Sequence, residues 1–258
     1  MNLNLRGHAV LLIGGTRGIG RETARLLAEE GTRLALVARE PEALEATATE
    51  VRRTGGQAVT IPADVTDPQQ AAEAVSRAAD TLGAFDAVIH AAGRGFRGAF
   101  LDVDDAAWRE ALDLNLLAPV RILRLARPHI TDGGRVVLLG AASAKRPTER
   151  QAASNAAKAA LANLTATLAV EFAPAIIVNC VAPGKILTDR RRDRAAAEAR
   201  GEGQSVEQRL RAHAEDVPLG RLGDPREVAA VVVFFASPMA SYTTGQSIIV
   251  DGGWARSV

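Results

Sequence analysis

A glycine-rich turn near the start of the chain has the composition of a phosphate-binding loop. It follows the apolar run Ala9–Ile13 and reads Gly14-Gly15-Thr16-Arg17-Gly18-Ile19-Gly20. Glycines allow a tight turn whose backbone comes close to a pyrophosphate, and the helix that follows offers free N–H groups and a partial positive charge. Glycine trios are common in proteins, but the position between a strand and a helix favours a dinucleotide site.

The residue after the second apolar run decides which dinucleotide fits. A carboxylate there accepts hydrogen bonds from a free ribose 2′-OH and repels a 2′-phosphate, whereas this chain has Ala38-Arg39. Arg17 can reach the same place, so the sequence favours NADP(H) over NAD. The alternative is that Arg39 pairs with a neighbouring glutamate at the surface. Asp64 is expected to accept from the adenine amino group, unless it serves only a turn or helix cap.

Short β-branched runs alternate with helical stretches along the whole chain. Strands are expected over 9–13, 34–37, 58–61, 87–90, 135–139, 176–181 and 247–250. Helices are expected after Gly20, with apolar residues at Ala24, Leu27 and Ala28, and over 42–54, 68–82, 108–128 and 154–172. Continuous apolar strands separated by helices predict an α/β fold with a parallel sheet covered on both faces. We therefore expect one doubly wound Rossmann-type domain over residues 1–258, with about seven strands and its ligands at their carboxyl ends.

Composition excludes several classes of protein. The 258 residues carry 31 Lys+Arg against 30 Asp+Glu, and this balance gives no reason to expect a nucleic-acid or membrane partner. One cysteine, Cys180, excludes an intrachain disulfide and a Cys-based zinc cage, so no metal is expected. The start lacks a signal-peptide pattern, and apolar runs such as Val228–Ala236 are strand-length. A cytoplasmic setting is the expectation. The single tyrosine is Tyr242.

These motifs together resemble the short-chain dehydrogenase/reductase superfamily, in its compact branch, and the likeness covers essentially the whole chain. It rests on the glycine turn and on Asp64-Val65-Thr66-Asp67, His90-Ala91-Ala92-Gly93, Asn115, Val178–Gly184, Pro218–Arg221, Thr244–Gln246 and Val250–Gly253. The sequence looks most like the 3-oxoacyl-carrier-protein reductases, which use NADPH. The resemblance implies further cofactor contacts from Val65, His90, Ala92, Gly93, Lys158, Pro183, Gly184 and Ile186.

The family's chemistry uses an Asn, a Ser, a Tyr and a Lys, and this chain matches only half of that set. The resemblance places Asn115 and Lys158 at the asparagine and the lysine. Ser154 stands four residues before Lys158, where the family has tyrosine, and Ala141 stands where the family has serine. Tyr242 lies in a late loop and does not replace the missing tyrosine. The two residues that hold the cofactor and relay protons in the family are therefore kept. The residue that donates the proton and the residue that polarises the carbonyl are changed.

A serine donates a proton less readily than a tyrosine, whose ordinary pKa is about 10. General acid–base help contributes typically about 10²–10⁴ in rate, so its loss weakens hydride transfer without forbidding it. Substrate, water or Ser154 can supply the proton instead. Ser143 can replace the polariser if its loop shifts, and Lys158 can act directly if burial lowers its pKa. His90, Glu149 and Lys145 are better explained by structural or solvated roles.

Three functions stay open at this point. The preferred one is an NADPH-dependent reductase of a small-molecule carbonyl with protonation that does not use tyrosine. The others are a non-redox enzyme on the same scaffold, such as a dehydratase, cyclase or isomerase, and an NADP(H)-binding protein without catalysis. The resemblance also implies a homodimer or homotetramer, and a substrate lid over 185–216. Arg190–Arg194 in that lid leave room for a carboxylate or phosphopantetheine-linked substrate, although a solvated helical lid is the simpler interpretation.

Overall fold

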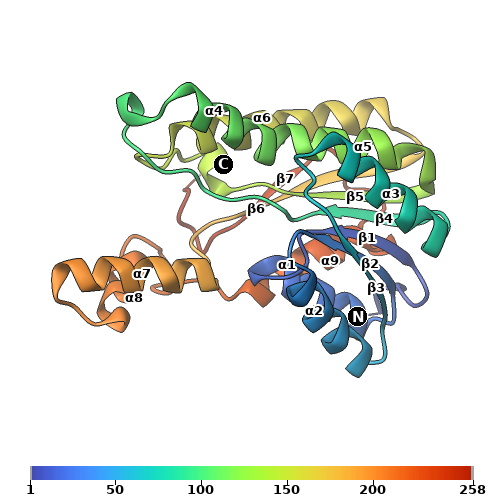
Figure 1. Cartoon of the computed structure of the whole chain (residues 1–258), viewed down its shortest axis with the longest axis horizontal. Coiled ribbons are helices and arrows are strands. Elements are labelled where there is room, and N and C mark those ends of the chain that lie inside the picture. Colours follow the sequence, from blue (N-terminus) through green and yellow to red (C-terminus); the bar gives the residue numbers. More distant parts are fainter. Residues whose placement is uncertain (1, 257–258) are drawn as a thin grey trace.

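The computed structural model describes residues 2–256, which form a seven-stranded parallel sheet in the order β3-β2-β1-β4-β5-β6-β7 (Figure 1). The strands are β1 Ala9–Ile13, β2 Arg33–Ala38, β3 Gln57–Pro62, β4 Phe85–His90, β5 Ile130–Leu139, β6 Ile176–Pro183 and β7 Ser247–Val250. Every neighbouring pair runs parallel. The predicted fold class is confirmed, and all carboxyl ends of the strands meet at one edge.

Helices cover both faces of the sheet (Figure 1). They are α1 Gly18–Glu29, α2 Pro41–Arg53, α3 Pro68–Leu82, α4 Asp105–Leu112, α5 Ala118–Ala126, α6 Ala152–Glu171, α7 Asp189–Glu202, α8 Val206–Ala214 and α9 Pro225–Ala236. Apolar residues of α3, α5 and α6 form one core, and those of α1, α2 and α9 form the other. Burial of these two apolar faces against the sheet is the main driving force for the fold.

One expected element differs from the structure, and one apolar run lies in an element that was not predicted. The predicted helix over 108–128 is interrupted by a π-helical turn, Asp113–Leu117, between α4 and α5. A π turn adds a residue to the helical repeat and often lies at a functional site, and this one contains the buried Asn115. The apolar run Val228–Ala236, although strand-length, lies in α9, where Pro225 and a capping box from Asp224 start a helix.

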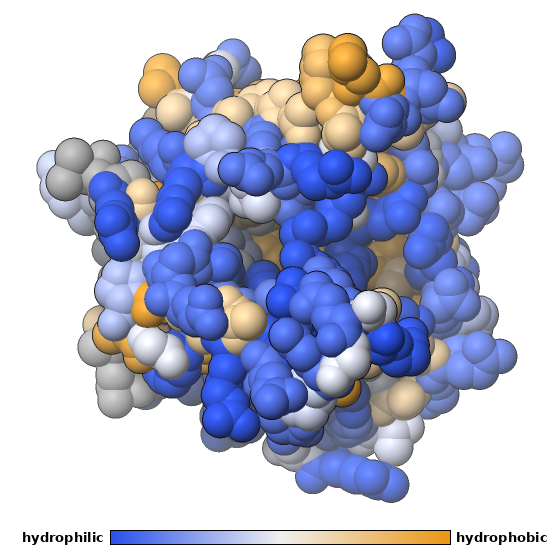
Figure 2. Space-filling view, turned by 90° about the vertical axis from the view of Figure 1, so that its left-hand side faces the viewer, coloured by the Kyte–Doolittle hydropathy of each residue, from blue (hydrophilic) through white to orange (hydrophobic). Residues whose placement is uncertain are grey.

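The segment expected to form a lid folds into α7 and α8, which pack on each other at one end of the molecule (Figure 1). The face that carries these helices is mainly hydrophilic and is hollowed near its centre (Figure 2). No helix within residues 2–256 combines the length and apolarity needed to cross a membrane. The role of this segment as a lid stays a prediction.

The turn between β1 and α1 depends on its glycines. Gly14 and Gly18 have φ of 86° and 48°, a region that favours glycine. A Cβ on Gly14 would lie 2.5 Å from the backbone nitrogen of Ala92, and one on Gly20 would overlap the carbonyl oxygen of Gly14. The turn therefore packs directly on the backbone that follows β4, which brings two loops of the sheet edge together.

We expect the substitution Gly20→Ala to destabilise the protein by about 1–3 kcal/mol, because the added methyl group overpacks the turn. Gly201→Ala is the matched control: it also lies in a helix, and a Cβ there meets nothing within 4 Å. That control should be neutral or stabilising by up to about 1 kcal/mol. Urea unfolding measures both changes, and equal midpoints for the two variants would contradict the packing argument.

Candidate active site

Three adjoining cavities lie along the carboxyl edge of the sheet. The first, about 290 Å³, is lined by Gly14, Thr16, Arg17, Arg39, Asp64, Val65, Ala92 and Gly93 among others. The second, about 300 Å³, is lined by Arg17, Gly18, Ile19, Gly20, Thr188 and Arg190 among others. The third, about 270 Å³, includes Ile19, Gly93, Ser143, Ser154, Lys158, Pro183, Gly184 and Ile186 in its wall. The cavities share wall residues, so they form one elongated groove.

Arg17 and Arg39 line the first cavity together. Arg17 is the N-cap of α1 but its side chain makes no capping bond, and the first turn of α1 has no acidic residue. The Arg39 guanidinium lies 3.8 Å from the Asp64 carboxylate rather than beside a neighbouring glutamate. Its side chain is 68% exposed, so this ion pair contributes little and leaves the arginine free to bind an anion.

Asp64 has the turn role that the sequence left open. Its Oδ1 accepts from the backbone N–H of Thr66 at 3.0 Å and from the Thr66 hydroxyl at 2.7 Å. These bonds fix the loop after β3 and orient the second carboxylate oxygen toward Arg39. A contact of Asp64 with an adenine amino group stays a prediction.

Lys158 and Asn115 are buried beside Gly93. Lys158 Nζ donates to the carbonyl oxygen of Leu139 at 2.9 Å. Asn115 Nδ2 donates to the carbonyl oxygens of Arg94 and Ala111, each at 3.0 Å. A Cβ on Gly93 would lie 2.9 Å from Asn115 Oδ1 and 3.2 Å from Lys158 Nζ, so glycine at this position lets the two polar groups approach one another.

Burial lowers the pKa of Lys158 from its ordinary value of 10.5 to about 8. Transfer of an ammonium group out of water disfavours its charged form, and within residues 2–256 Nζ forms one hydrogen bond, to the carbonyl oxygen of Leu139. A lysine with this pKa exchanges its proton near neutral pH, which is the range where general acids and bases work best.

Ser154 is held by the loop that follows β4. Its Oγ accepts from the backbone N–H of Phe96 at 2.6 Å and lies 3.4 Å from the carbonyl oxygen of Phe96. The guanidinium of Arg94 stacks 4.2 Å from the centre of the Phe96 ring and also pairs with Glu110. No sequence pattern predicts this contact, because Phe96 is distant from Ser154 along the chain.

Ser143 lies in a short 3₁₀ turn, Ala142–Ala144, directly after Ala141. Both Ser143 and Ala141 line the cavity that contains Ser154 and Lys158. The structure therefore brings together all four residues for which catalytic roles are expected: Ser143, Ser154 and Lys158 in one wall, and Asn115 directly behind Gly93. Their catalytic roles stay predictions.

His90 and Gly15 differ from the other expected cofactor residues because neither lines the three cavities. Gly15 packs on the side chains of Leu12 and Leu36. His90 ends β4 in full burial, and its Nε2 has no hydrogen-bond partner within residues 2–256. Burial, with the nearby Lys158 charge, lowers the pKa of His90 to about 3. The imidazole is therefore neutral at ordinary pH and is no proton donor.

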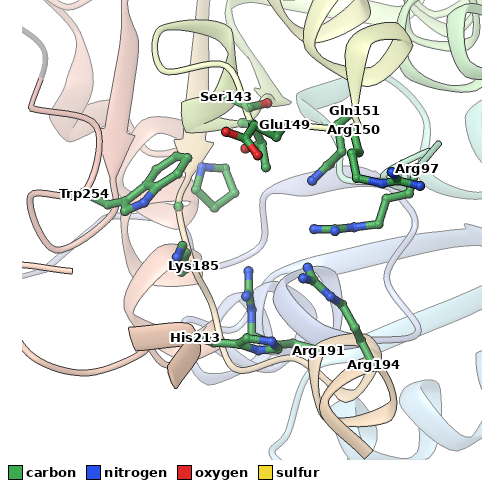
Figure 3. Close-up of a pocket in the computed structure, with 14 residues that line it drawn as sticks. Arg97, Ser143, Glu149, Arg150, Gln151, Lys185, Arg191, Arg194, His213 and Trp254 are labelled. Carbon is green, nitrogen blue, oxygen red and sulfur yellow. The ribbon is translucent and has the colours of Figure 1, made fainter. Parts of the chain in front are cut away.

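A fourth cavity, about 380 Å³, adjoins the site, and the sequence does not predict it as one cavity (Figure 3). Its wall includes Glu149, and Lys185 and His213 of the predicted lid segment, but also Arg97, Arg150 and Trp254, which sequence reasoning missed. These residues come from separate loops and from α8, so no local pattern marks them. Lys145 is exposed and lines none of the four cavities.

Comparisons with known proteins agree with this geometry. A family profile described as enoyl-(acyl carrier protein) reductase matches residues 14–255. The short-chain reductase protein NovJ of Streptomyces niveus is 35% identical over 245 residues, which cover 94% of this chain and 92% of that protein. The 2-keto-3-deoxy-L-fuconate dehydrogenase of Xanthomonas campestris is 32% identical over 259 residues, covering 99% of this chain and 82% of that protein. This chain belongs to the short-chain dehydrogenase/reductase family.

Solved structures of this family superpose closely on the chain. The L-sorbose reductase of Gluconobacter frateurii, complexed with NADPH and L-sorbose, has a TM-score of 0.97 and 28% identity, with 100% of both chains covered. An NADPH complex of a mutant actinorhodin polyketide ketoreductase has a TM-score of 0.91 and 28% identity, covering 97% of this chain and 98% of that one. This short-chain dehydrogenase/reductase is therefore an oxidoreductase of CH–OH and C=O groups that uses NAD(P)(H).

The groove of this short-chain dehydrogenase/reductase suits a dinucleotide. The helix N-terminus at Gly18 and the glycine turn offer backbone groups to a pyrophosphate, and the groove continues from Arg39 to Lys158. Within residues 2–256, no three His, Cys, Asp or Glu side chains gather in a way that would hold a metal ion. The closer likeness to 3-oxoacyl-carrier-protein reductases stays a prediction, because the matching profile has the enoyl-reductase description.

The lowered pKa of Lys158 can be measured directly, because the chain has only three lysines, Lys145, Lys158 and Lys185. With ¹³C-labelled lysine, the Lys158 side-chain resonance should titrate with a midpoint near pH 8, since burial disfavours its ammonium form. Lys158→Arg removes that signal and assigns it. A midpoint above pH 10 for Lys158 would show that the buried site does not perturb the lysine.

Proposed function

We propose that this short-chain dehydrogenase/reductase reduces a carbonyl of a small molecule with NADPH and takes the proton from Ser154, without a tyrosine. The observation that carries the proposal is the 2.6 Å bond from Phe96 N–H to Ser154 Oγ, in the cavity that also contains Lys158. The names of two relatives, L-sorbose reductase and 2-keto-3-deoxy-L-fuconate dehydrogenase, support a small polar hydroxycarbonyl substrate.

The residues that would hold NADPH follow from the groove. The turn Gly14–Gly20 and the N-terminus of α1 would take the pyrophosphate, and Arg17 and Arg39 would take the 2′-phosphate. Lys158 and the Pro183-Gly184 end of β6 border the reacting end of the groove. When bound, NADPH supplies the hydride that is added to the carbonyl carbon.

Reduction leaves negative charge on the carbonyl oxygen, which then takes up a proton. A free serine hydroxyl is a weak acid, but the N–H of Phe96 donates to Ser154 Oγ and stabilises negative charge there. A hydrogen bond to the charged form lowers the pKa of an acid. The contact between Ser154 and the Phe96 carbonyl oxygen is long, at 3.4 Å, so the hydroxyl proton is available to a substrate oxygen.

Lys158 restores the proton that Ser154 gives up. It lies one helical turn after Ser154 on α6, and both side chains line the same cavity. Its pKa of about 8 leaves the ammonium form dominant at neutral pH and makes that proton easy to release. Asn115, held by the backbone of Arg94 and Ala111, positions its carboxamide beside this lysine. Reduction should therefore slow as the pH rises above about 8.

The cofactor preference can be tested with Arg39→Asp. Loss of a charge-assisted bond to the 2′-phosphate costs about 1.5–3 kcal/mol, so NADPH affinity should fall roughly 10- to 100-fold, while NADH affinity should hold or rise. Arg53→Asp, an equal charge change at an exposed position on α2, is the control. Fluorescence titration measures both nucleotides. Unchanged NADPH binding in Arg39→Asp would refute the 2′-phosphate assignment.

The proton path can be tested with Ser154→Ala, assayed by NADPH oxidation with L-sorbose and with 2-oxo sugar acids. If Ser154 is the donor, kcat should fall by about 10²–10⁴ with NADPH affinity unchanged. Ser154→Thr, which keeps a hydroxyl, should recover part of the rate. Full kcat in Ser154→Ala would instead assign proton donation to water or to the substrate. No oxidation of NADPH by the unmodified protein with any carbonyl would contradict the proposed reaction.

A further inference from the structure

The fourth cavity is strongly cationic (Figure 3). It adjoins the reacting end of the groove, with which it shares wall residues. Five basic side chains line it, Arg97, Arg150, Lys185, Arg191 and Arg194, against one acidic side chain, Glu149. In Figure 3, Arg191 and Arg194 extend from below and Arg97 extends from the opposite side toward the same space, while Glu149 lies near Ser143 on another wall.

Two of the five cations are neutralised by carboxylates behind the wall. Lys185 Nζ lies 2.5 Å from Asp216 Oδ1, and Arg194 Nε lies 2.6 Å from Glu198 Oε1. Glu198 also pairs with Arg209 and with His213. These contacts hold this wall of the cavity in place. They also compensate the positive charges of Lys185 and Arg194.

Arg97 and Arg191 are not neutralised in this way. Within residues 2–256, neither guanidinium forms an ion pair with a carboxylate. Arg191 donates from Nε to the carbonyl oxygen of Ile186 at 2.9 Å, which fixes the side chain and leaves its terminal N–H groups free. Burial and the nearby charges of Arg194 and Arg97 lower the pKa of Arg191 to about 10. Positive charges held close together repel one another, and a bound anion would relieve this repulsion.

The backbone at the mouth of the cavity supports a binding role. Arg150 has φ of 57°, an uncommon conformation for an arginine, and such strained residues often lie at ligand sites. Its carbonyl oxygen accepts from Gly98 N–H at 2.9 Å. This bond joins the loop that carries Arg97 to the loop that precedes α6, so two arginines are presented together at one opening.

This cavity and the one that contains Ser154 and Lys158 share part of their walls. The shared residues are Ala141, Ser143, Gln151, Pro183, Gly184 and Arg191. We propose that the arginine cavity binds an oxyanion of the substrate, a carboxylate or a phosphate, through Arg97 and Arg191, so that a carbonyl in the same molecule lies at Ser154. Arginine suits this task because its planar fork matches both oxyanions with two parallel bonds. The inference rests on the proposed reductase function for its catalytic consequence, but not for anion binding itself.

Binding of two simple probes, malonate for the carboxylate and inorganic phosphate for the phosphate, tests the proposal by titration calorimetry. The unmodified protein, saturated with NADPH, should bind at least one of them. Arg97→Gln and Arg191→Gln should each weaken that binding by tenfold or more, because each removes a charge-assisted pair. Arg192→Gln, at an exposed position on the same helix as Arg191, is the matched control and should bind as tightly as the unmodified protein.

The pattern of outcomes separates this inference from the proposed function. Malonate binding without phosphate binding assigns a carboxylate substrate, and the reverse assigns a phosphate ester. Failure of both probes to bind, or equal binding in the arginine variants and the unmodified protein, overturns the inference even if neutral ketones are reduced. Anion binding that depends on Arg97 and Arg191 but comes with no NADPH oxidation on any keto acid or keto phosphate refutes the reductase proposal and leaves the anion site standing.

Discussion

Burial of the Lys158 ammonium at the carboxyl edge of the sheet is the constraint on which the rest of the site depends. A charge removed from water is tolerated only where neighbouring groups accept its hydrogen bonds, and here the end of β5 supplies the Leu139 carbonyl oxygen. A side chain at Gly93 would crowd Asn115 Oδ1 at 2.9 Å and Lys158 Nζ at 3.2 Å, which favours glycine there. His90 remains neutral because its own burial disfavours the charged form, and the nearby charge of Lys158 acts in the same direction.

The π turn between α4 and α5 brings a second buried polar side chain, Asn115, to the region of Gly93 and Lys158. The π turn at Asp113–Leu117 carries Asn115 into full burial, where the backbone of Arg94 and Ala111 uses both amide hydrogens. The loop after β4 is thereby fixed at Arg94 by Asn115 and at Phe96 by Ser154. A loop fixed from two helices forms a rigid wall, and rigid walls are what a site needs to hold reacting groups in position.

The sequence predicts the sheet and the glycine turn, because each is encoded by local periodicity or by spacing along the chain. The Ser154–Lys158 pair is predicted only through the family resemblance. The π turn escapes such prediction because residues 108–128 keep a helical pattern through it. The Phe96–Ser154 bond and the arginine cavity escape for a different reason. Both join segments that are far apart along the chain, and only the tertiary fold brings Arg97 and Arg191 to one cavity.

The cationic cavity and the presence of Ser154 where the family has tyrosine fit together electrostatically. Hydride addition creates negative charge on the substrate oxygen, and fixed positive charges near that oxygen stabilise it most effectively in a site shielded from water. Arg191 borders both cavities, so in the proposed reaction its charge would act on the carbonyl as well as on an oxyanion. A weaker acid than tyrosine would then suffice at the position of Ser154, because the arginines would share the stabilisation that a tyrosine provides by early proton transfer.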